Sequence, residues 1–228
     1  MRNDFGIIKA EKPIRIQSLE AVRAMAFLAI FLYHAVKSFP GKGIIYKVLS
    51  IAPGAWGVSV FFILSGFLMT YSYWNRQIEN SIKEACLFSI KKIKRLYPLH
   101  LVMLLVGALR LYIHRETLIG IGWRLLLTIP LIQTWFPVGY MSVNSVAWYL
   151  SVCLFLYFMF PFLLPWIKES GLKQSCIRIL LIYLSQFLIG LLVYRFTSLE
   201  VIWITYCHPL YRLGDFAIGG LLASIFID

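Results

Sequence analysis

Two residues that could do chemistry together, Arg23 and His34, stand eleven positions apart near the start of this chain. The stretch from Ala24 to Val36 carries no aspartate, glutamate, lysine or arginine. In a helix, eleven residues turn the chain to within about 20° of its starting direction and advance it by roughly 16 Å, so the two side chains share a face. We therefore expect Arg23 at the membrane boundary and His34 deep in the membrane, where an ionisable group is a functional candidate.

Structural alternatives stand beside this interpretation. Arg23 could anchor the helix at the lipid headgroups, and His34 could only hydrogen-bond a neighbouring helix. Glu20, three residues before Arg23, could pair with that arginine or only cap the helix start. Helix geometry alone leaves these alternatives open.

A second group of residues places small side chains in an aromatic stretch that runs from Gly57 to Leu68. Gly57, Ser65 and Gly66 would let helix backbones approach closely, so one interpretation is a packing seam. The functional interpretation is that this approach brings the stretch against the His34 helix and shapes a substrate channel.

Four cations, Lys91, Lys92, Lys94 and Arg95, come directly before the next apolar stretch. Such a cluster usually binds anionic lipid headgroups, at about 1 kcal/mol per charge. The alternative is a phosphate site, in which Arg95 and Arg23 hold a phosphorylated donor such as a coenzyme A thioester while its acyl end enters the membrane.

The elements that must position these groups are membrane helices. Of the 228 residues, 60% are hydrophobic and only 14% are charged, and the mean hydropathy is +0.78, which predicts an integral membrane protein and excludes a soluble one. The formal charge of +12 comes from basic residues clustered beside apolar runs, as membrane orientation requires, so we expect no nucleic-acid partner. The four cysteines have no metal-binding spacing, so we expect no metal site.

Apolar stretches of helix length predict an all-α bundle with six or seven membrane crossings, in one domain over residues 1–228 with a cytosolic tail at 1–18. The stretch at 123–136 is short enough to be re-entrant. The predicted stretches are 21–39, 51–74, 96–113, 123–136, 146–167, 177–194 and 211–227.

The charge pattern depends on whether the 123–136 stretch crosses the membrane. If it does not, the basic residues before position 16, those from Arg76 to Arg95, and Lys168 with Lys173 all fall on one side, which would be the cytosol. If it crosses, Lys168 and Lys173 move outside. Lys37, Lys42 and Lys47 are external in both arrangements.

Taken together, these segments resemble acyltransferase family 3, whose multi-spanning members move acyl groups, often acetyl, onto extracytoplasmic sugars. The resemblance covers nearly the whole chain, in the order of the family's motifs. It is carried by Leu19–Arg23 running to Tyr33–Ala35, by Gly57–Leu68, by Lys91–Pro98, by Trp148–Val152 with Tyr157 and Pro161, and by Arg212–Phe216 with Gly219.

The resemblance implies a membrane acyltransferase of the inner (cytoplasmic) membrane with its N-terminus in the cytosol. His34 would be the general base, or else a transient acyl carrier, in the transfer of an acyl group from acyl-CoA to a hydroxyl of an envelope polysaccharide or lipid-linked sugar. Acyl-CoA, most simply acetyl-CoA, would be a substrate rather than a bound cofactor. The expected donor-binding residues are Arg23, Arg95, Lys91 and Lys92, and the supporting residues are Glu20, Ser65, Gly66, Trp148, Ser151 and Arg212.

Three features depart from the family pattern. Cys153 stands where an acidic residue is common, and Ser59 stands where an aspartate is common. The family typically has about ten spans, so we expect a C-terminally short version of that fold, whose missing helices a partner could supply.

Two other functions remain open from the sequence. The chain could be a non-catalytic membrane component of glycan export, in which His34 and the basic clusters line a polar path, or an inactive truncated relative. The acceptor sugar, the acyl chain and the oligomeric state are not specified by these residues.

Overall fold

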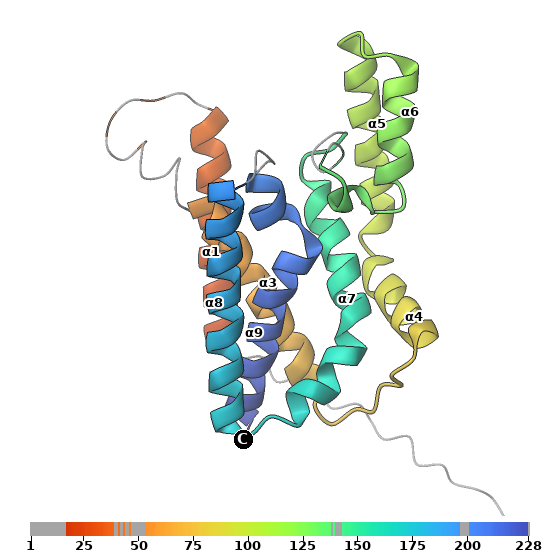
Figure 1. The fold of residues 1–228 in the computed structure, drawn as a ribbon. Coiled ribbons are helices and arrows are strands. Elements are labelled where there is room, and N and C mark those ends of the chain that lie inside the picture. Colours follow the sequence, from red (N-terminus) through yellow and green to blue (C-terminus); the bar gives the residue numbers. More distant parts are fainter. Residues whose placement is uncertain are drawn as a thin grey trace, which may run out of the picture.

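A computed structural model describes residues 17–38, 53–137, 143–196 and 201–227, together with positions 41, 43, 46 and 139. All the elements in these ranges are helical, which confirms the predicted fold class (Figure 1). They are α1 (Gln17–Ser38), α3 (Pro53–Tyr73), α4 (Ile82–Ile93), α5 (Tyr97–Ile113), α6 (Leu118–Thr128), the 3-10 turn η1 (Gln133–Trp135), α7 (Ala147–Lys168), α8 (Leu172–Phe196), the π-helical turn η2 (Trp203–Cys207) and α9 (Pro209–Ile227).

Five of these helices, α1, α3, α7, α8 and α9, are long and apolar enough to cross a membrane. A sixth crossing is formed if α4 and α5, which meet at a bend of 68°, count as one broken span. The predicted crossing at 123–136 is not one helix, because α6 ends at Thr128 and η1 follows as a single turn. The 11 residues of α6 reach only about 16 Å, roughly half of a hydrocarbon core.

The connections place the basic segments at one end of the bundle (Figure 1). The start of α1, the α3–α4 loop, the α7–α8 turn and the end of α9 lie together there, while the α5–α6 hairpin projects beyond the opposite end. Arg76, Lys168 and Lys173 are therefore near the same end as the start of α1, as the re-entrant arrangement requires. Residues 1–16 of the predicted tail and the side chains of Lys37, Lys42 and Lys47 lie outside the described part of the chain.

Helix α4 was not predicted, because charged residues interrupt its apolar pattern. Its start is fixed by Ser81, whose Oγ accepts a hydrogen bond from the backbone N–H of Glu84 at 3.3 Å. Thr117 caps α6 in the same way, accepting from the N–H of Gly120 at 3.1 Å. Both caps satisfy helix N–H groups that would otherwise lack partners.

Helix α3 lies between α1 and α9 and is the centre of the bundle. A Cβ atom on Gly57 would come within 2.8 Å of Ile30 on α1, and a Cβ on Gly66 would come within 2.0 Å of the carbonyl oxygen of Phe216 on α9. From the other side, a Cβ on Gly219 would come within 1.9 Å of the Ile63 carbonyl oxygen. The packing-seam interpretation of these glycines is thus confirmed, because only hydrogen fits at these crossings.

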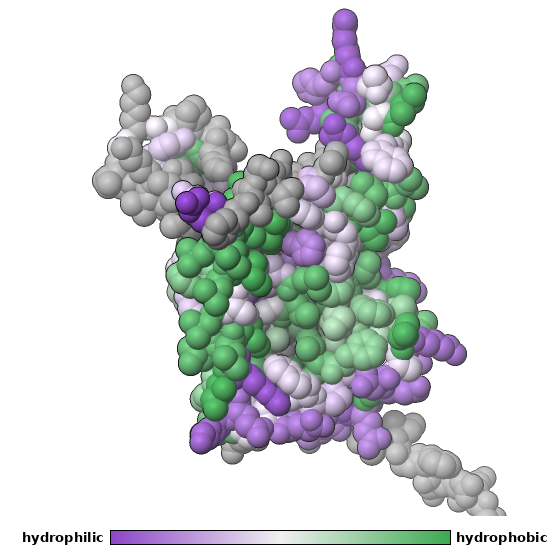
Figure 2. Space-filling view, in the orientation of Figure 1, coloured by the Kyte–Doolittle hydropathy of each residue, from purple (hydrophilic) through white to green (hydrophobic). Residues whose placement is uncertain are grey.

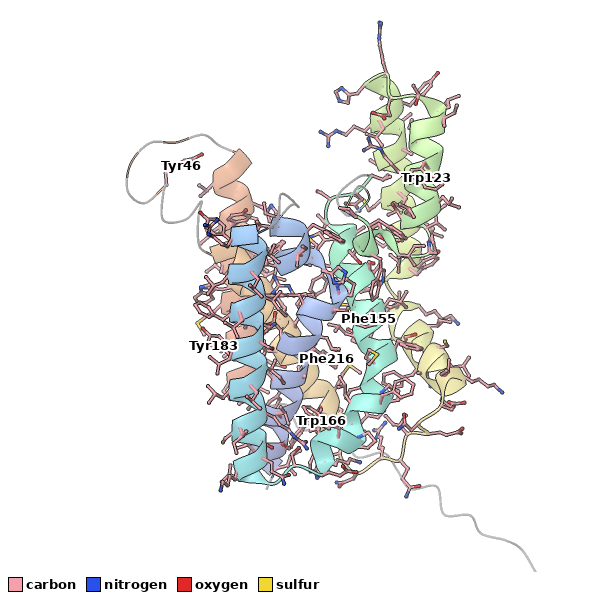
Figure 3. The ribbon with its side chains drawn as sticks, viewed as in Figure 1. Tyr46, Trp123, Phe155, Trp166, Tyr183 and Phe216 are labelled. Carbon is pink, nitrogen blue, oxygen red and sulfur yellow. The ribbon has the colours of Figure 1, made fainter. Side chains whose placement is uncertain are left out.

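Aromatic side chains fill the space between α3, α7 and α9, and Figure 3 shows Phe216 pointing into this interior. Phe62, Phe160 and Phe216 are almost completely buried. On the outside, hydrophobic residues cover the sides of the bundle, whereas hydrophilic ones gather at the end with the α3–α4 and α7–α8 connections and at the tip of the α5–α6 hairpin (Figure 2). This distribution is the one expected for a protein that crosses lipid.

Hydrogen bonds attach the segment between α6 and α7 to the bundle. Ser151 on α7 donates to the carbonyl oxygen of Leu131 at 2.5 Å and lies 2.7 Å from the Thr134 hydroxyl. The indole N–H of Trp203 donates to the Thr134 carbonyl at 2.9 Å. The segment that was predicted to be re-entrant is therefore held against α7 and η2.

Candidate active site

A cavity of about 1190 Å³ opens between α1, α3, α8, α9 and the start of α7. Its walls are mainly apolar and aromatic, as is usual for sites that bind organic molecules. The polar side chains that line it include those of His34, Ser59, Gln186, Arg212 and Asp215.

His34 reaches this cavity from the last turns of α1, a helix that ends at Ser38. Its imidazole stands edge-on to the ring of Tyr33, with 5.3 Å between the ring centroids and an interplanar angle of 77°. The side chain is exposed, and His34 lies near the C-terminal end of the candidate span Gln17–Val36, where the cavity gives access to the ring.

Arg212 and Asp215 form an ion pair in the wall of the same cavity, with 2.6 Å between Nη1 and Oδ2. Arg212 is 3% exposed and Asp215 is 7% exposed. The Nη1 atom of Arg212 also donates to the Ser59 hydroxyl at 2.7 Å, and Nε donates to the carbonyl oxygen of Tyr206 at 2.8 Å. The ion pair lies within α9, and the other hydrogen bonds of Arg212 tie α9 to both α3 and η2.

Helix α8 contributes one amide to this network. Gln186 Nε2 donates to Oδ1 of Asp215 at 3.2 Å and to the carbonyl oxygen of Tyr211 at 2.9 Å. The amide fits because Gly214 has no side chain: a Cβ there would lie 2.7 Å from Nε2. Four elements, α3, η2, α8 and α9, are thus joined by one set of charge-assisted hydrogen bonds.

Three of the predicted site residues come together at the cavity: His34, Trp148 and Arg212. Trp148 is buried on α7 and packs against Tyr206, with 4.8 Å between the ring centroids. Ser65 and Gly66 lie on α3 outside the cavity wall; Ser65 is beside the Tyr149 side chain, and Gly66 forms the α3–α9 crossing. Ser151 holds the α6–α7 connection rather than lining the cavity.

The predicted donor-binding residues are not gathered into one site. Arg23 is exposed on α1, and Lys91 and Arg95 are exposed near the α4–α5 bend, on the opposite side of the bundle (Figure 1). Lys92 packs its Nζ over the ring of Tyr73 at 4.7 Å. None of these four lines the cavity, and Glu20 lies exposed in the first turn of α1.

The sequence analysis missed Gln186 and Asp215 as site residues, although both are polar groups in apolar helices, which is a usable signal. His208 lies outside the cavity lining, and its ring stands edge-on between Trp135 and Trp203 at centroid distances of 5.4 and 5.3 Å. Burial lowers the pKa of His208. Within the described residues, no cluster of three or more His, Cys, Asp or Glu could hold a metal ion.

Comparison with known proteins identifies relatives of the whole chain. A family model described as an acyltransferase domain, that of acyltransferase family 3, matches residues 16–227. Acyltransferase MdmB of Streptomyces mycarofaciens is 27% identical over 230 residues, which cover 93% of this chain and 58% of MdmB. A putative O-acetyltransferase of Staphylococcus aureus strain COL is 25% identical over 207 residues, covering 86% of this chain and 32% of that protein.

Peptidoglycan O-acetyltransferase OatA of Listeria monocytogenes is 26% identical over 175 residues, which cover 69% of this chain and 26% of OatA. The chain thus spans between about a quarter and three fifths of the length of these relatives. No solved structure matches it. Because the family match extends over all the helices that build the cavity, the chain belongs to acyltransferase family 3.

Proposed function

We propose that this chain transfers an acyl group, most simply acetyl, to a hydroxyl of an envelope polysaccharide or lipid-linked sugar, with His34 as the general base. One observation carries the proposal: His34 opens onto a cavity of about 1190 Å³ that also holds a fixed ion pair. The names of the relatives, which include acyltransferase and O-acetyltransferase, support the same class of reaction.

The chemistry requires one proton acceptor at the attacking oxygen. Neutral His34 takes the proton of the acceptor hydroxyl as that oxygen attacks the thioester carbonyl carbon. The donor's sulfur then leaves as a thiolate and receives the proton back from the imidazolium. An imidazole is suited to both steps because its proton affinity is balanced near neutral pH.

The acceptor would lie against the aromatic walls. Trp148, Tyr149 and Tyr206 present rings to the cavity, and such faces pack well against the apolar faces of a sugar ring. Thr205 and Ser145 also line the cavity and offer hydrogen-bonding groups to sugar hydroxyls.

The donor would reach His34 along α1. Arg23, Phe27, Ile30 and His34 follow one another at helical spacing, and the last three line the cavity. We assign Arg23 to the phosphates of an acyl-CoA at the N-terminal end of α1, which would be the cytosolic end. The cluster around Lys91, Lys92 and Arg95 is on the other side of the bundle, where anionic lipid headgroups are the simpler ligand.

The test is mass spectrometry of envelope glycans from cells that express the chain at matched membrane levels. We expect acyl groups with the wild type and with a His114→Ala control, because His114 is exposed beyond the end of α5. We expect none above background with His34→Ala. Equal acylation by the His34 variant would reject the general-base role and favour a non-catalytic function.

A further inference from the structure

Arg212 lies in the wall of the cavity that holds His34, and some of its N–H groups have no acceptor among the described residues. A guanidinium has five N–H groups. Those on Nε and Nη1 are taken by the Tyr206 carbonyl, the Ser59 hydroxyl and the Asp215 carboxylate. The second terminal nitrogen, Nη2, has no acceptor among the described residues, although Arg212 lines the cavity.

The guanidinium is also held in one orientation. Its three acceptors come from α3, η2 and α9, and Asp215 is in turn held by Gln186 on α8. The rings of Phe62, Tyr206 and Tyr211 surround its Cζ atom at 5.8, 5.1 and 5.8 Å. A donor pair fixed in this way needs no rearrangement when charge develops in front of it.

The unused edge of the guanidinium reaches open space. Nη2 has no acceptor among the described residues, yet it is not one of their buried polar atoms without a partner, and Arg212 lines the cavity. Ser59 contributes a neutral hydroxyl to the guanidinium, so Asp215 is the carboxylate that balances its charge in the described structure. The Nη2 edge therefore stays available to an oxygen that carries partial negative charge.

We propose that Arg212 is a second catalytic residue, whose Nη2 edge binds the carbonyl oxygen of the acyl donor and stabilises the oxyanion formed during transfer. The inference rests on the proposed acyltransferase function. As the acceptor oxygen bonds to the carbonyl carbon, the π electrons move onto the carbonyl oxygen and the hydroxyl proton moves to His34. When the carbonyl re-forms, the carbon–sulfur bond breaks and the thiolate takes that proton.

Asp215 and Gln186 act through Arg212 and are positioning residues. Their contacts decide where the guanidinium points, but the oxygen of the reacting carbonyl would touch only Arg212. Asp215→Asn should therefore lower activity less than loss of the guanidinium does.

The experiment uses the full chain purified in detergent and 4-nitrophenyl acetate as the probe, because the carbonyl of this ester forms the same oxyanion and releases coloured 4-nitrophenolate. For Arg212→Ala we expect kcat to fall by about 10²–10³, as when an oxyanion donor is removed, while KM stays within about threefold. Added guanidinium ion should restore part of kcat to Arg212→Ala but none to His34→Ala.

The matched control is Arg178→Ala. Arg178 is a partly buried arginine on α8 that donates to the Trp166 carbonyl at 2.7 Å and does not line the cavity. This variant should keep the wild-type kcat. If Arg212→Ala does not fold, Arg212→Lys decides, because lysine keeps the charge but lacks the flat two-donor edge. Its kcat, measured well below its thermal midpoint, should fall.

Three outcomes would overturn the inference. Wild-type kcat in Arg212→Lys or Arg212→Ala would reject the oxyanion role while leaving the His34 function intact. A rise in KM without a fall in kcat would make Arg212 a ground-state binding residue only. Ester cleavage by the wild type no faster than by His34→Ala would reject the proposed function itself, and the oxyanion role with it.

Discussion

Arg23 lies on the same face of α1 as His34, roughly 16 Å away along the helix. It is outside the cavity wall. A cation there cannot touch the reacting carbonyl, so any contribution must come from binding a distant part of the donor. Binding that is equal in the ground and transition states changes KM and not kcat. Arg23 and Arg212 are thus expected to have different kinetic signatures.

Arg23→Ala should raise KM for acetyl-CoA by about tenfold, because loss of one charge-assisted contact costs roughly 1.4 kcal/mol of binding free energy. It should leave kcat and the thermal midpoint unchanged. Arg110→Ala is the control, since Arg110 is exposed on α5, toward the hairpin tip. Donor-dependent initial rates in detergent give both constants. A normal KM in the Arg23 variant would remove the phosphate-binding role.

The residues at the cavity differ in how far sequence could predict them. His34, Trp148 and Arg212 were predicted, because they belong to motifs with recognisable order. Gln186 and Asp215 were missed as site residues, because their role depends on the contact between α8 and α9. The expected phosphate site formed by Arg23 together with Arg95 is not present, because these residues lie on opposite sides of the bundle (Figure 1). No local sequence pattern specifies which helices become neighbours.

At the scale of the elements, two glycine crossings set the position of α3. The backbone of α3 meets that of α9 at Gly66 and Gly219. Ser59 lies on the same helix and reaches Arg212. A shift between α3 and α9 would therefore separate the hydroxyl from the guanidinium as well as open the core.

Gly66→Ala should unfold or strongly destabilise the protein, because the added methyl would lie 2.0 Å from the Phe216 carbonyl oxygen. Overpacking usually costs about 1–3 kcal/mol, and two rigid backbones cannot move apart easily. Gly190→Ala on α8 meets nothing within 4 Å and should be neutral. Thermal midpoints in detergent make the comparison; equal midpoints would contradict the α3–α9 crossing.

The long helices were predictable because they are apolar over many turns, and their bounds differ from the prediction by only a few residues. The α4–α6 region was not, because its signals conflict. Charges inside α4 masked a helix that packs on α7, and the apolar residues at 123–136 form a short helix and a turn. Here hydrogen bonds from Ser151 and Trp203 determine the structure.

At the scale of the whole molecule, the end of the bundle with the α3–α4 and α7–α8 connections carries Arg76, Lys83, Lys168 and Lys173. Because cytoplasmic loops carry the excess of lysine and arginine, the end with the α3–α4 loop should face the cytosol. The α5–α6 hairpin would then project on the opposite side of the membrane, together with the end of α1 that carries His34 (Figure 1).

This orientation can be measured with a membrane-impermeant maleimide in spheroplasts. Arg115→Cys at the hairpin tip should react in intact spheroplasts, and Gln77→Cys in the α3–α4 loop should react only after permeabilisation; both positions are exposed. The exposed native Cys86 and Cys176 are first changed to serine. The reverse labelling pattern would place the N-terminal end of α1 outside.

The ion pair of α9 also has a consequence for how the protein is made. Arg212 and Asp215 stand three residues apart on one helix, so the segment leaves the ribosome with its opposite charges already matched and enters the translocon at a lower cost. Ser59 lies 153 residues earlier, so α3 is inserted into the bilayer before the arginine that its hydroxyl binds. The nascent chain therefore carries His34 before Arg212 has reached the cavity, so we expect no acyl transfer until α9 has been inserted.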